Sequence, residues 1–134
     1  MRIKQLLIGI TASVIAISSY VEIAIADLKF PMLVYRTGAY APNGIPNADG
    51  FVDYYKMINA RDGGIGGEKI FHPECETGYK TQVGVECYEK NKKDAMVFQP
   101  MSTGITYQLI PKATADGVTV YSTRYEITST ANSK

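Results

Sequence analysis

Short apolar runs alternate with amphipathic helical patterns along residues 28–121, and few folds accommodate that order. Four strands are predicted, at residues 28–35, 68–74, 95–99 and 118–121. Three helices are predicted between them, at residues 46–62, 80–91 and 105–115. Strands that alternate with helices of this length form βαβ crossovers and a parallel sheet. The predicted fold class is therefore α/β, with part of a doubly wound parallel sheet.

The predicted elements of residues 28–74 differ in how strongly the sequence marks them. Residues 28–35 (LKFPMLVY) form an almost continuous apolar run, which is typical of a strand buried on both faces of a parallel sheet. Residues 36–44 (RTGAYAPNG) are rich in Gly, Pro and Asn and predict a loop. Pro46 is expected near the first turn of the next helix. In the weaker strand at residues 68–74, Pro73 indicates an edge position or a strand end.

The loops that follow the strands are the expected ligand-binding region. In open α/β sheets the binding crevice lies outside the carboxyl ends of the strands. Here these positions are residues 36–44, residues 75–80, residues 100–104 and the residues after Tyr121. Candidate binding residues are therefore expected in these segments.

The first 26 residues have the organisation of a cleavable secretory signal. Arg2 and Lys4 precede an uncharged, largely apolar stretch at residues 5–21, and Ala24 and Ala26 occupy the positions three and one residues before the expected cleavage point. A chain that begins in this way is exported across a membrane.

A retained membrane anchor is the alternative to cleavage. Ser18, Ser19 and Glu22 interrupt the apolar core, whereas a spanning helix needs about 20 predominantly apolar residues. Cleavage is favoured, so residues 27–134 are predicted to form a periplasmic or secreted protein without stable membrane insertion.

This presumed mature segment is formally neutral. Without Arg2, Lys4 and Glu22, the 14 basic and 13 acidic residues of the whole sequence become 12 of each. A neutral chain with no basic cluster lacks the electrostatic attraction that drives binding to nucleic acids and anionic lipids. Small molecules or proteins are therefore the expected partners, and a segment of this length is expected to build one small domain.

The two cysteines, Cys75 and Cys87, predict a disulfide bond, because their number is even and the chain is expected to be exported. A zinc site or a thiol nucleophile with His72 is the alternative. Alternation along a strand would send His72 and Cys75 to opposite faces, and His72 is the only histidine. No metal or other cofactor is predicted. Enzyme activity is not predicted either, because His72 has no evident nucleophile beside it.

Ser102, Thr103 and Gly104 lie between the third predicted strand and its helix. Hydroxyl groups and backbone N–H groups at a helix start bind anions such as a carboxylate, and the helix dipole assists them. The alternative is that Ser102 or Thr103 only caps the helix, as such residues commonly do. The spacing alone leaves both interpretations open.

Two further features have both a structural and a functional interpretation. Residues 63–67 (GGIGG) invite comparison with a phosphate-binding loop, but they follow a helix and lack the Lys-Ser/Thr pair of such loops, so a turn is predicted. Tyr40 and Tyr125 fall in loops at the predicted carboxyl edge, where aromatic side chains can either pack or form the wall of a small-molecule pocket.

Several short motifs, taken together in their order and spacing, resemble a known family. They are residues 34–40 (VYRTGAY), 48–51 (ADGF), 62–65 (DGGI), 76–79 (ETGY) and 100–106 (PMSTGIT). From the signal to about Tyr121, the chain resembles the start of a periplasmic substrate-binding protein of the branched-chain amino acid type, similar to leucine-binding protein. The resemblance implies two α/β lobes that close on a ligand and deliver it to an ABC permease, without enzyme activity.

The resemblance also implies roles for individual residues. The carboxylate contact of the family falls on Thr103, and the loops after the first and fourth strands contribute further ligand contacts. The implied ligand-binding residues are Thr37, Tyr40, Ser102, Thr103, Gly104 and Ser122. Beyond Ser122 the sequence departs from the family pattern, which leaves no role assigned to Tyr125.

The family's proteins are much longer than this chain. Residues 27–134 are therefore predicted to form an incomplete N-terminal lobe, with exposed apolar surface and weak or undetectable ligand binding when alone. The alternative hypothesis is a small exported interaction module built on the half-domain, with no role in transport.

Overall fold

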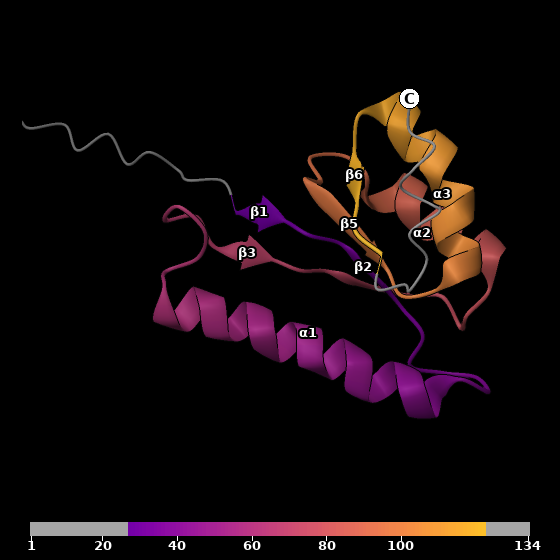
Figure 1. The fold of residues 1–134 in the computed structure, drawn as a ribbon, viewed down its shortest axis with the longest axis horizontal. Coiled ribbons are helices and arrows are strands. Elements are labelled where there is room, and N and C mark those ends of the chain that lie inside the picture. The colour runs from indigo at the N-terminus through magenta and orange to yellow at the C-terminus, as the bar shows by residue number, and fades with distance from the viewer. Residues whose placement is uncertain (1–26, 123–134) are drawn as a thin grey trace, which may run out of the picture.

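A computed structural model describes residues 27–122, in which strands and helices alternate (Figure 1). The strands are β1 (Leu28–Lys29), β2 (Met32–Val34), β3 (Ile70–Phe71), β4 (Glu74–Glu76), β5 (Val97–Pro100) and β6 (Thr119–Val120). The helices are α1 (Ala41–Arg61), α2 (Thr81–Asn91) and α3 (Thr103–Asp116). All strand pairs are parallel, which confirms the predicted α/β class with a partial parallel sheet.

Two of the predicted strands are each divided in two by a proline. Pro31 separates β1 from β2, and Pro73 separates β3 from β4. The ladder nevertheless continues across both breaks, because the Phe30 and Met32 N–H groups donate to the carbonyls of Phe71 and Pro73 at 2.8 and 2.9 Å. β1 and β2 therefore form one long strand, and β3 and β4 form a second long strand beside it. β4 lies at the edge of the described sheet, as Pro73 predicted.

The register against β5 changes by one residue near Pro31. Lys29 pairs with Ala95, an offset of 66 residues, whereas Met32 pairs with Gln99, an offset of 67. Pro31 has no N–H group to donate, so the ladder loses one donor in this stretch. One additional residue on the β5 side is accommodated there as a bulge, and regular pairing resumes at Met32.

The central strand β2 has a different hydrophobic core on each face. Met32 and Val34 pack with α1, whereas Leu33 packs with α2 and α3. All three side chains are at most 1% exposed. Figure 1 shows the same arrangement, with α1 on one side of the sheet and α2 and α3 on the other. The strand order β4-β2-β5-β6 makes the sheet doubly wound around β2.

Helix α1 begins earlier than the sequence predicted. It starts at Ala41, so the predicted loop at residues 36–44 is too long, and Pro46 lies inside the helix rather than in its first turn. Pro42 occupies the start of the helix instead. The fixed φ angle of proline suits a helix, and at this position no helical hydrogen bond is lost. Helix α3 likewise begins at Thr103 rather than at residue 105, which places Gly104 in its first turn.

The glycine-rich segment after α1 is a turn, as predicted. The φ angles of Gly63, Gly64, Gly66 and Gly67 lie between 63° and 103°, in the left-handed region that other residues rarely adopt. At Gly64 a Cβ would also collide with the Glu68 carbonyl. These glycines return the chain from α1 to β3.

The predicted disulfide bond is present between Cys75 on β4 and Cys87 on α2, with a Cα–Cα distance of 5.9 Å. It joins the edge strand to the helix that packs against Leu33 and Phe98 in the second core. A Tyr88 hydroxyl that donates to Asp116 at 2.8 Å ties α2 to the end of α3. Burial, together with Asp116, raises the pKa of Tyr88 to about 12.

Three parts of the sequence analysis fall outside residues 27–122. They are the signal at residues 1–26, the divergent residues 123–134, and Tyr125 within them. Among the helices that the structure describes, none has both the length and the apolar character of a membrane span.

Gly84 and Gly50 provide a matched pair for testing the packing of α2 on α3. A Cβ at Gly84 would stand 2.6 Å from the buried Ile105 side chain, whereas nothing lies within 4 Å at Gly50 on α1. We expect Gly84→Ala to lower the free energy of unfolding by about 1–3 kcal/mol through overpacking. Gly50→Ala should raise it by up to about 1 kcal/mol through helix propensity. Urea denaturation measures both, and equal effects would contradict the close approach.

Reduction of the disulfide bond is expected to lower the free energy of unfolding by about 3 kcal/mol, because the bond closes a short loop in the unfolded chain. Urea denaturation with and without a reductant measures the change. The double variant Cys75→Ala/Cys87→Ala is the control, since its midpoint should not respond to the reductant. A wild-type midpoint that is equally insensitive would mean that Cys75 and Cys87 are not bonded.

Candidate functional site

The six predicted binding residues lie at the carboxyl ends of three adjacent strands. Thr37 and Tyr40 follow β2, the segment from Ser102 to Gly104 follows β5, and Ser122 follows β6. The chain leaves β2 toward α1 on one face and leaves β5 toward α3 on the other face. Neighbouring strands whose connections diverge in this way create the switch-point crevice where α/β sheets bind ligands.

The start of α3 brings three hydroxyl-bearing residues together. Ser102 is 4% exposed and occupies the N-cap position, but its side chain makes no capping hydrogen bond. The Thr106 hydroxyl lies 2.9 Å from the Ser102 carbonyl and 3.3 Å from the Ser122 hydroxyl. Thr106 thus joins the loop after β5 to the residue after β6. Ser102 is thus the N-cap residue, as the capping alternative predicted, but the Ser102 hydroxyl makes no capping hydrogen bond.

Gly104 lies against the start of the neighbouring helix α2. A Cβ at this position would stand 3.0 Å from the Thr81 hydroxyl oxygen. The first turn of α3, which contains Thr103 and Gly104, therefore lies next to the loop between β4 and α2. The leading N–H groups of a helix have no intrahelical acceptor and present a partial positive charge, which suits a carboxylate.

Thr77 fixes the loop that follows β4. This residue is 2% exposed. Its N–H and its hydroxyl both donate to the Val34 carbonyl, at 2.8 and 2.7 Å, and its hydroxyl accepts from the Tyr79 N–H at 3.2 Å. The sheet ladder between β2 and β4 is thereby prolonged into the loops, which places residues 35–40 beside residues 77–80.

The Glu76 carboxylate holds these two loops together. It accepts hydrogen bonds from the N–H groups of Arg36 and Gly78, both at 2.7 Å, and from the Thr37 hydroxyl at 3.1 Å. Partial burial opposes ionisation, but these hydrogen bonds outweigh it and lower the pKa of Glu76. Because the Thr37 hydroxyl donates to Glu76, it can only accept a hydrogen bond from a ligand.

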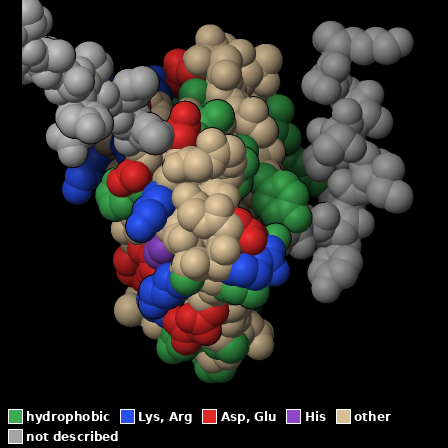
Figure 2. Space-filling model, turned by 90° about the vertical axis from the view of Figure 1, so that its left-hand side faces the viewer, with side chains coloured by type: hydrophobic (Ala, Val, Ile, Leu, Met, Phe, Trp, Pro, Cys, Tyr) green, Lys and Arg blue, Asp and Glu red, His purple; other side chains and the backbone are tan. Residues whose placement is uncertain are grey.

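The Arg36 side chain is used within the protein. Its guanidinium donates to both Glu74 oxygens, at 2.6 and 2.8 Å, and to Asp49 at 2.7 Å. These hydrogen bonds raise the pKa of Arg36 further above its already high value. An anionic ligand would have to displace two carboxylates to reach this cation. On the face seen in Figure 2, acidic and basic side chains are likewise interspersed rather than separated by sign.

Tyr40 is the exposed aromatic residue of the site. Its side chain is 55% exposed, it occupies the N-cap position of α1, and its ring lies 4.5 Å from the Tyr79 ring. The contact with Tyr79 explains why Tyr40 is held at the carboxyl edge. The sequence analysis did not assign a site role to Tyr79, Glu76, Thr81 or Thr106, because their place in the site depends on contacts between distant segments.

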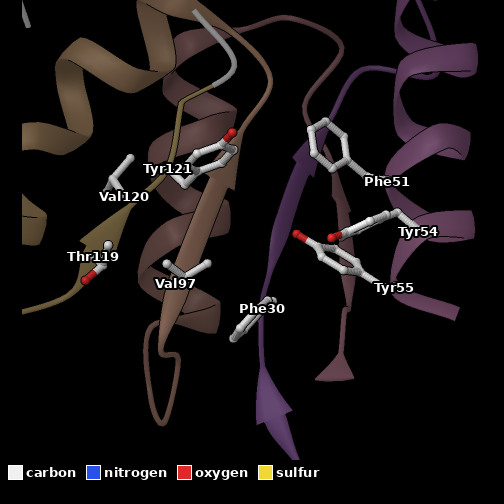
Figure 3. Close-up of a pocket in the computed structure, with 8 residues that line it drawn as sticks. All are labelled: Phe30, Phe51, Tyr54, Tyr55, Val97, Thr119, Val120 and Tyr121. Atoms are coloured by element: carbon white, nitrogen blue, oxygen red, sulfur yellow. The ribbon is translucent and has the colours of Figure 1, made fainter. Parts of the chain in front are cut away.

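A separate apolar cavity lies between α1 and the strands (Figure 3). It measures about 380 Å³, and none of the six predicted residues lines it. Figure 3 shows the α1 side chains Phe51, Tyr54 and Tyr55 projecting from the helix toward the strands, with Val97 of β5 and Tyr121, the residue after β6, across from them. The residues that line the cavity are therefore a different set from the six predicted binding residues.

Neither the disulfide region nor any other part of residues 27–122 gathers three or more side chains able to hold a metal ion. Cys75 and Cys87 are bonded to each other. The His72 ring lies 5.5 Å from the Tyr55 ring, on the side of the sheet that α1 covers. The residues that the structure brings together are hydroxyl, amide and aromatic groups, which can bind a small polar molecule.

An open parallel sheet with such groups at its switch point is the architecture of a ligand-binding α/β lobe. The model of the periplasmic binding protein family matches residues 27–134, and the chain belongs to that family. The family consists of substrate-binding proteins rather than enzymes. No curated protein sequence matches the chain.

Solved structures show the same fold over much of the chain. A protein from the Pseudomonas fluorescens group, described as an ABC transporter permease, is 37% identical with a TM-score of 0.66, over 70% of this chain and 24% of its own. A fatty acid ABC transporter substrate-binding protein from Thermomonospora curvata is 21% identical with a TM-score of 0.68, over 74% and 25%.

A third structure is the branched-chain amino acid transporter substrate-binding protein LivJ from Streptococcus pneumoniae, in complex with isoleucine. It is 22% identical with a TM-score of 0.65, over 72% of this chain and 28% of its own. The chain thus spans about a quarter of the length of these structures. It corresponds to the N-terminal part of the family's fold.

The Glu76 hydrogen bonds predict a pH-dependent stability. The pKa of Glu76 is lowered in the folded protein, so its contribution is complete above the unfolded-state value of 4.5 and is lost as the pH falls through the folded-state value. Since Glu76 is exposed, we expect Glu76→Gln to cost only about 1 kcal/mol at pH 7. Urea denaturation should show a smaller difference at pH 3. The exposed Asp53→Asn is the control, and an undiminished difference at pH 3 would contradict the mechanism.

Proposed function

We propose that this chain is the ligand-binding part of an ABC importer's substrate-binding component, and that it binds a small carboxylate. The ligands proposed are branched-chain amino acids or related small amides. The observation that carries the proposal is the meeting of the α3 start with the loops after β2 and β6 at the switch point of the sheet. Membership of the periplasmic binding protein family supports it.

The carboxylate is proposed to bind at the first turn of α3, with Ser102, Thr103 and Gly104 as its contacts. Two features support this position. The leading N–H groups of a helix favour an anion. In addition, Arg36, the arginine that follows β2, is already paired with Glu74 and Asp49. A carboxylate is therefore directed to backbone and hydroxyl donors rather than to a guanidinium group.

Thr37, Tyr40 and Ser122 are proposed to contact the remainder of the ligand. Thr37 offers a hydroxyl acceptor, because its proton is donated to Glu76. Tyr40 offers an exposed ring, and the Ser122 hydroxyl lies 3.3 Å from the Thr106 hydroxyl, which itself donates to the Ser102 carbonyl. These residues supply one side of a binding cleft.

The cellular context is proposed from the same evidence. Residues 1–26 are proposed to direct export, which would place residues 27–134 in the periplasm or outside the cell as an N-terminal lobe. An ABC permease would be the partner that receives the ligand. A ligand that meets only one side of a cleft loses about half of its contacts, so we expect affinity in the millimolar range for this chain alone.

A substitution at Thr103 tests the site separately from the fold. Thr103→Asp adds a negative charge in the first turn of α3, which favours the helix but repels a carboxylate. We expect the variant to be at least as stable as the wild type and to lose binding, whereas Thr103→Asn should retain it. Titration of ¹⁵N-labelled protein with isoleucine, benzoate and hexanoate should shift the amide signals of Gly104 and Ile105 saturably in the wild type.

Two outcomes would contradict the proposal. In one, none of the three carboxylates shifts these amides in the wild type. In the other, Thr103→Asp binds as well as Thr103→Asn does. Micromolar affinity for the chain alone would leave the site in place but would overturn the expectation that a second lobe is needed.

A further inference from the structure

Tyr79 has an unfavourable backbone conformation. Its φ angle is 63°, and within residues 27–122 Asp94 is the only other non-glycine residue with a positive φ. Asp and Asn tolerate the left-handed region, whereas a bulky side chain is disfavoured there. Glycine or asparagine would therefore be the more stable choice at position 79.

The surrounding hydrogen bonds impose this conformation. The Tyr79 N–H donates to the Thr77 hydroxyl at 3.2 Å, and the Lys80 N–H donates to the Thr77 carbonyl at 2.9 Å. Thr77 itself is buried and anchored to Val34 on the central strand. The turn is thus fixed independently of the Tyr79 ring, and the position of the ring is a consequence of the turn.

The Tyr79 ring lies in a row of three tyrosine rings. The buried Tyr35 ring meets it edge-on, with centroids 4.9 Å apart and an interplanar angle of 83°. The Tyr40 ring meets it at 4.5 Å and 38°. Tyr79 and Tyr40 are 36% and 55% exposed, so the row begins in the core and ends in solvent. The three rings come from the end of β2, the start of α1 and the loop before α2.

The loop that carries Tyr79 leads directly into the start of α2, which approaches the proposed carboxylate position. Tyr79 stands two residues before Thr81, whose hydroxyl oxygen is within 3.0 Å of where a Cβ on Gly104 would lie. The segment from Tyr79 to Thr81 therefore connects the exposed rings to the first turn of α3. A ligand whose carboxylate binds at that turn would contact the exposed rings if the rest of the ligand extended over this segment.

We propose that Tyr79, together with Tyr40, forms a ligand-facing aromatic wall that selects carboxylates carrying a flat unsaturated group over aliphatic ones. This inference rests on the proposed function, and among small carboxylates and amides at the same site it favours ligands with a planar group over the branched-chain amino acids. Strained residues persist where the surrounding structure over-determines them, and they cluster at ligand-binding sites. A planar π group stacks on exposed phenol rings with a preference of about twofold to tenfold over a saturated group.

Benzoate and cyclohexanecarboxylate are the probes, because they share a carboxylate and a six-membered ring and differ in planarity. We expect wild-type protein to bind benzoate about twofold to tenfold more tightly, measured by saturation of the Gly104 amide shift. Tyr79→Asn should reduce this ratio to about one, while its thermal unfolding temperature stays equal or rises because the left-handed strain is relieved. Tyr79→Phe should keep the ratio.

Asp94→Asn is the matched control, since it changes the other non-glycine residue of positive φ in residues 27–122, on the loop before β5. It should leave the ratio unchanged. The inference is overturned if wild type does not prefer benzoate, or if Tyr79→Asn keeps the preference. If neither probe shifts Gly104 in wild type, the carboxylate site itself fails, which distinguishes failure of the proposed function from failure of the aromatic wall.

Discussion

The parallel pairing of β2 with a strand on each side is the interaction on which the rest of the structure depends. Its three residues are at most 1% exposed, and they alternate between the core under α1 and the core under α2 and α3. A polar substitution in this strand would therefore damage the core that its side chain faces. The same pairing aligns the carboxyl ends of β4, β2 and β5, so that their loops meet at one edge without any further constraint.

At the carboxyl ends of β2 and β4, the hydrogen bonding of the sheet continues into the loops beyond the strands. Thr77 makes two hydrogen bonds to the Val34 carbonyl, and Glu76 accepts three hydrogen bonds from the adjoining loops. These contacts fix the backbone of residues 35–40 and 76–80 before any ligand arrives. Preorganised binding groups lose less conformational entropy on binding, which suits a site that must recognise a small molecule with few contacts.

The sequence predicted the order of strands and helices, the disulfide, and the position of the candidate loops at the carboxyl ends of the strands, because these follow from periodicity and residue type. It misplaced the start of α1, since Pro42 and Pro46 both suit a first turn and only packing against Tyr35 distinguishes them. A Cβ at Gly44 would collide with the Tyr35 carbonyl, so α1 must already be close to β2 at that point. The roles of Tyr79 and Thr106 depend on neighbours far away in sequence, which no local pattern records.

The two faces of the sheet are covered unequally, and this accounts for the apolar cavity of about 380 Å³ on the α1 side. Within residues 27–122, two helices cover one face of the sheet, whereas α1 is the only helix on the other. Parallel sheets are normally covered on both faces, and none of the described helices covers the apolar side chains over β5 and β6 on the α1 side. The Tyr55 hydroxyl beside the cavity already donates to the buried Gln99 at 3.0 Å. The walls therefore have the character of an uncovered core, whereas the hydroxyl and amide groups that can orient a ligand lie at the carboxyl edge.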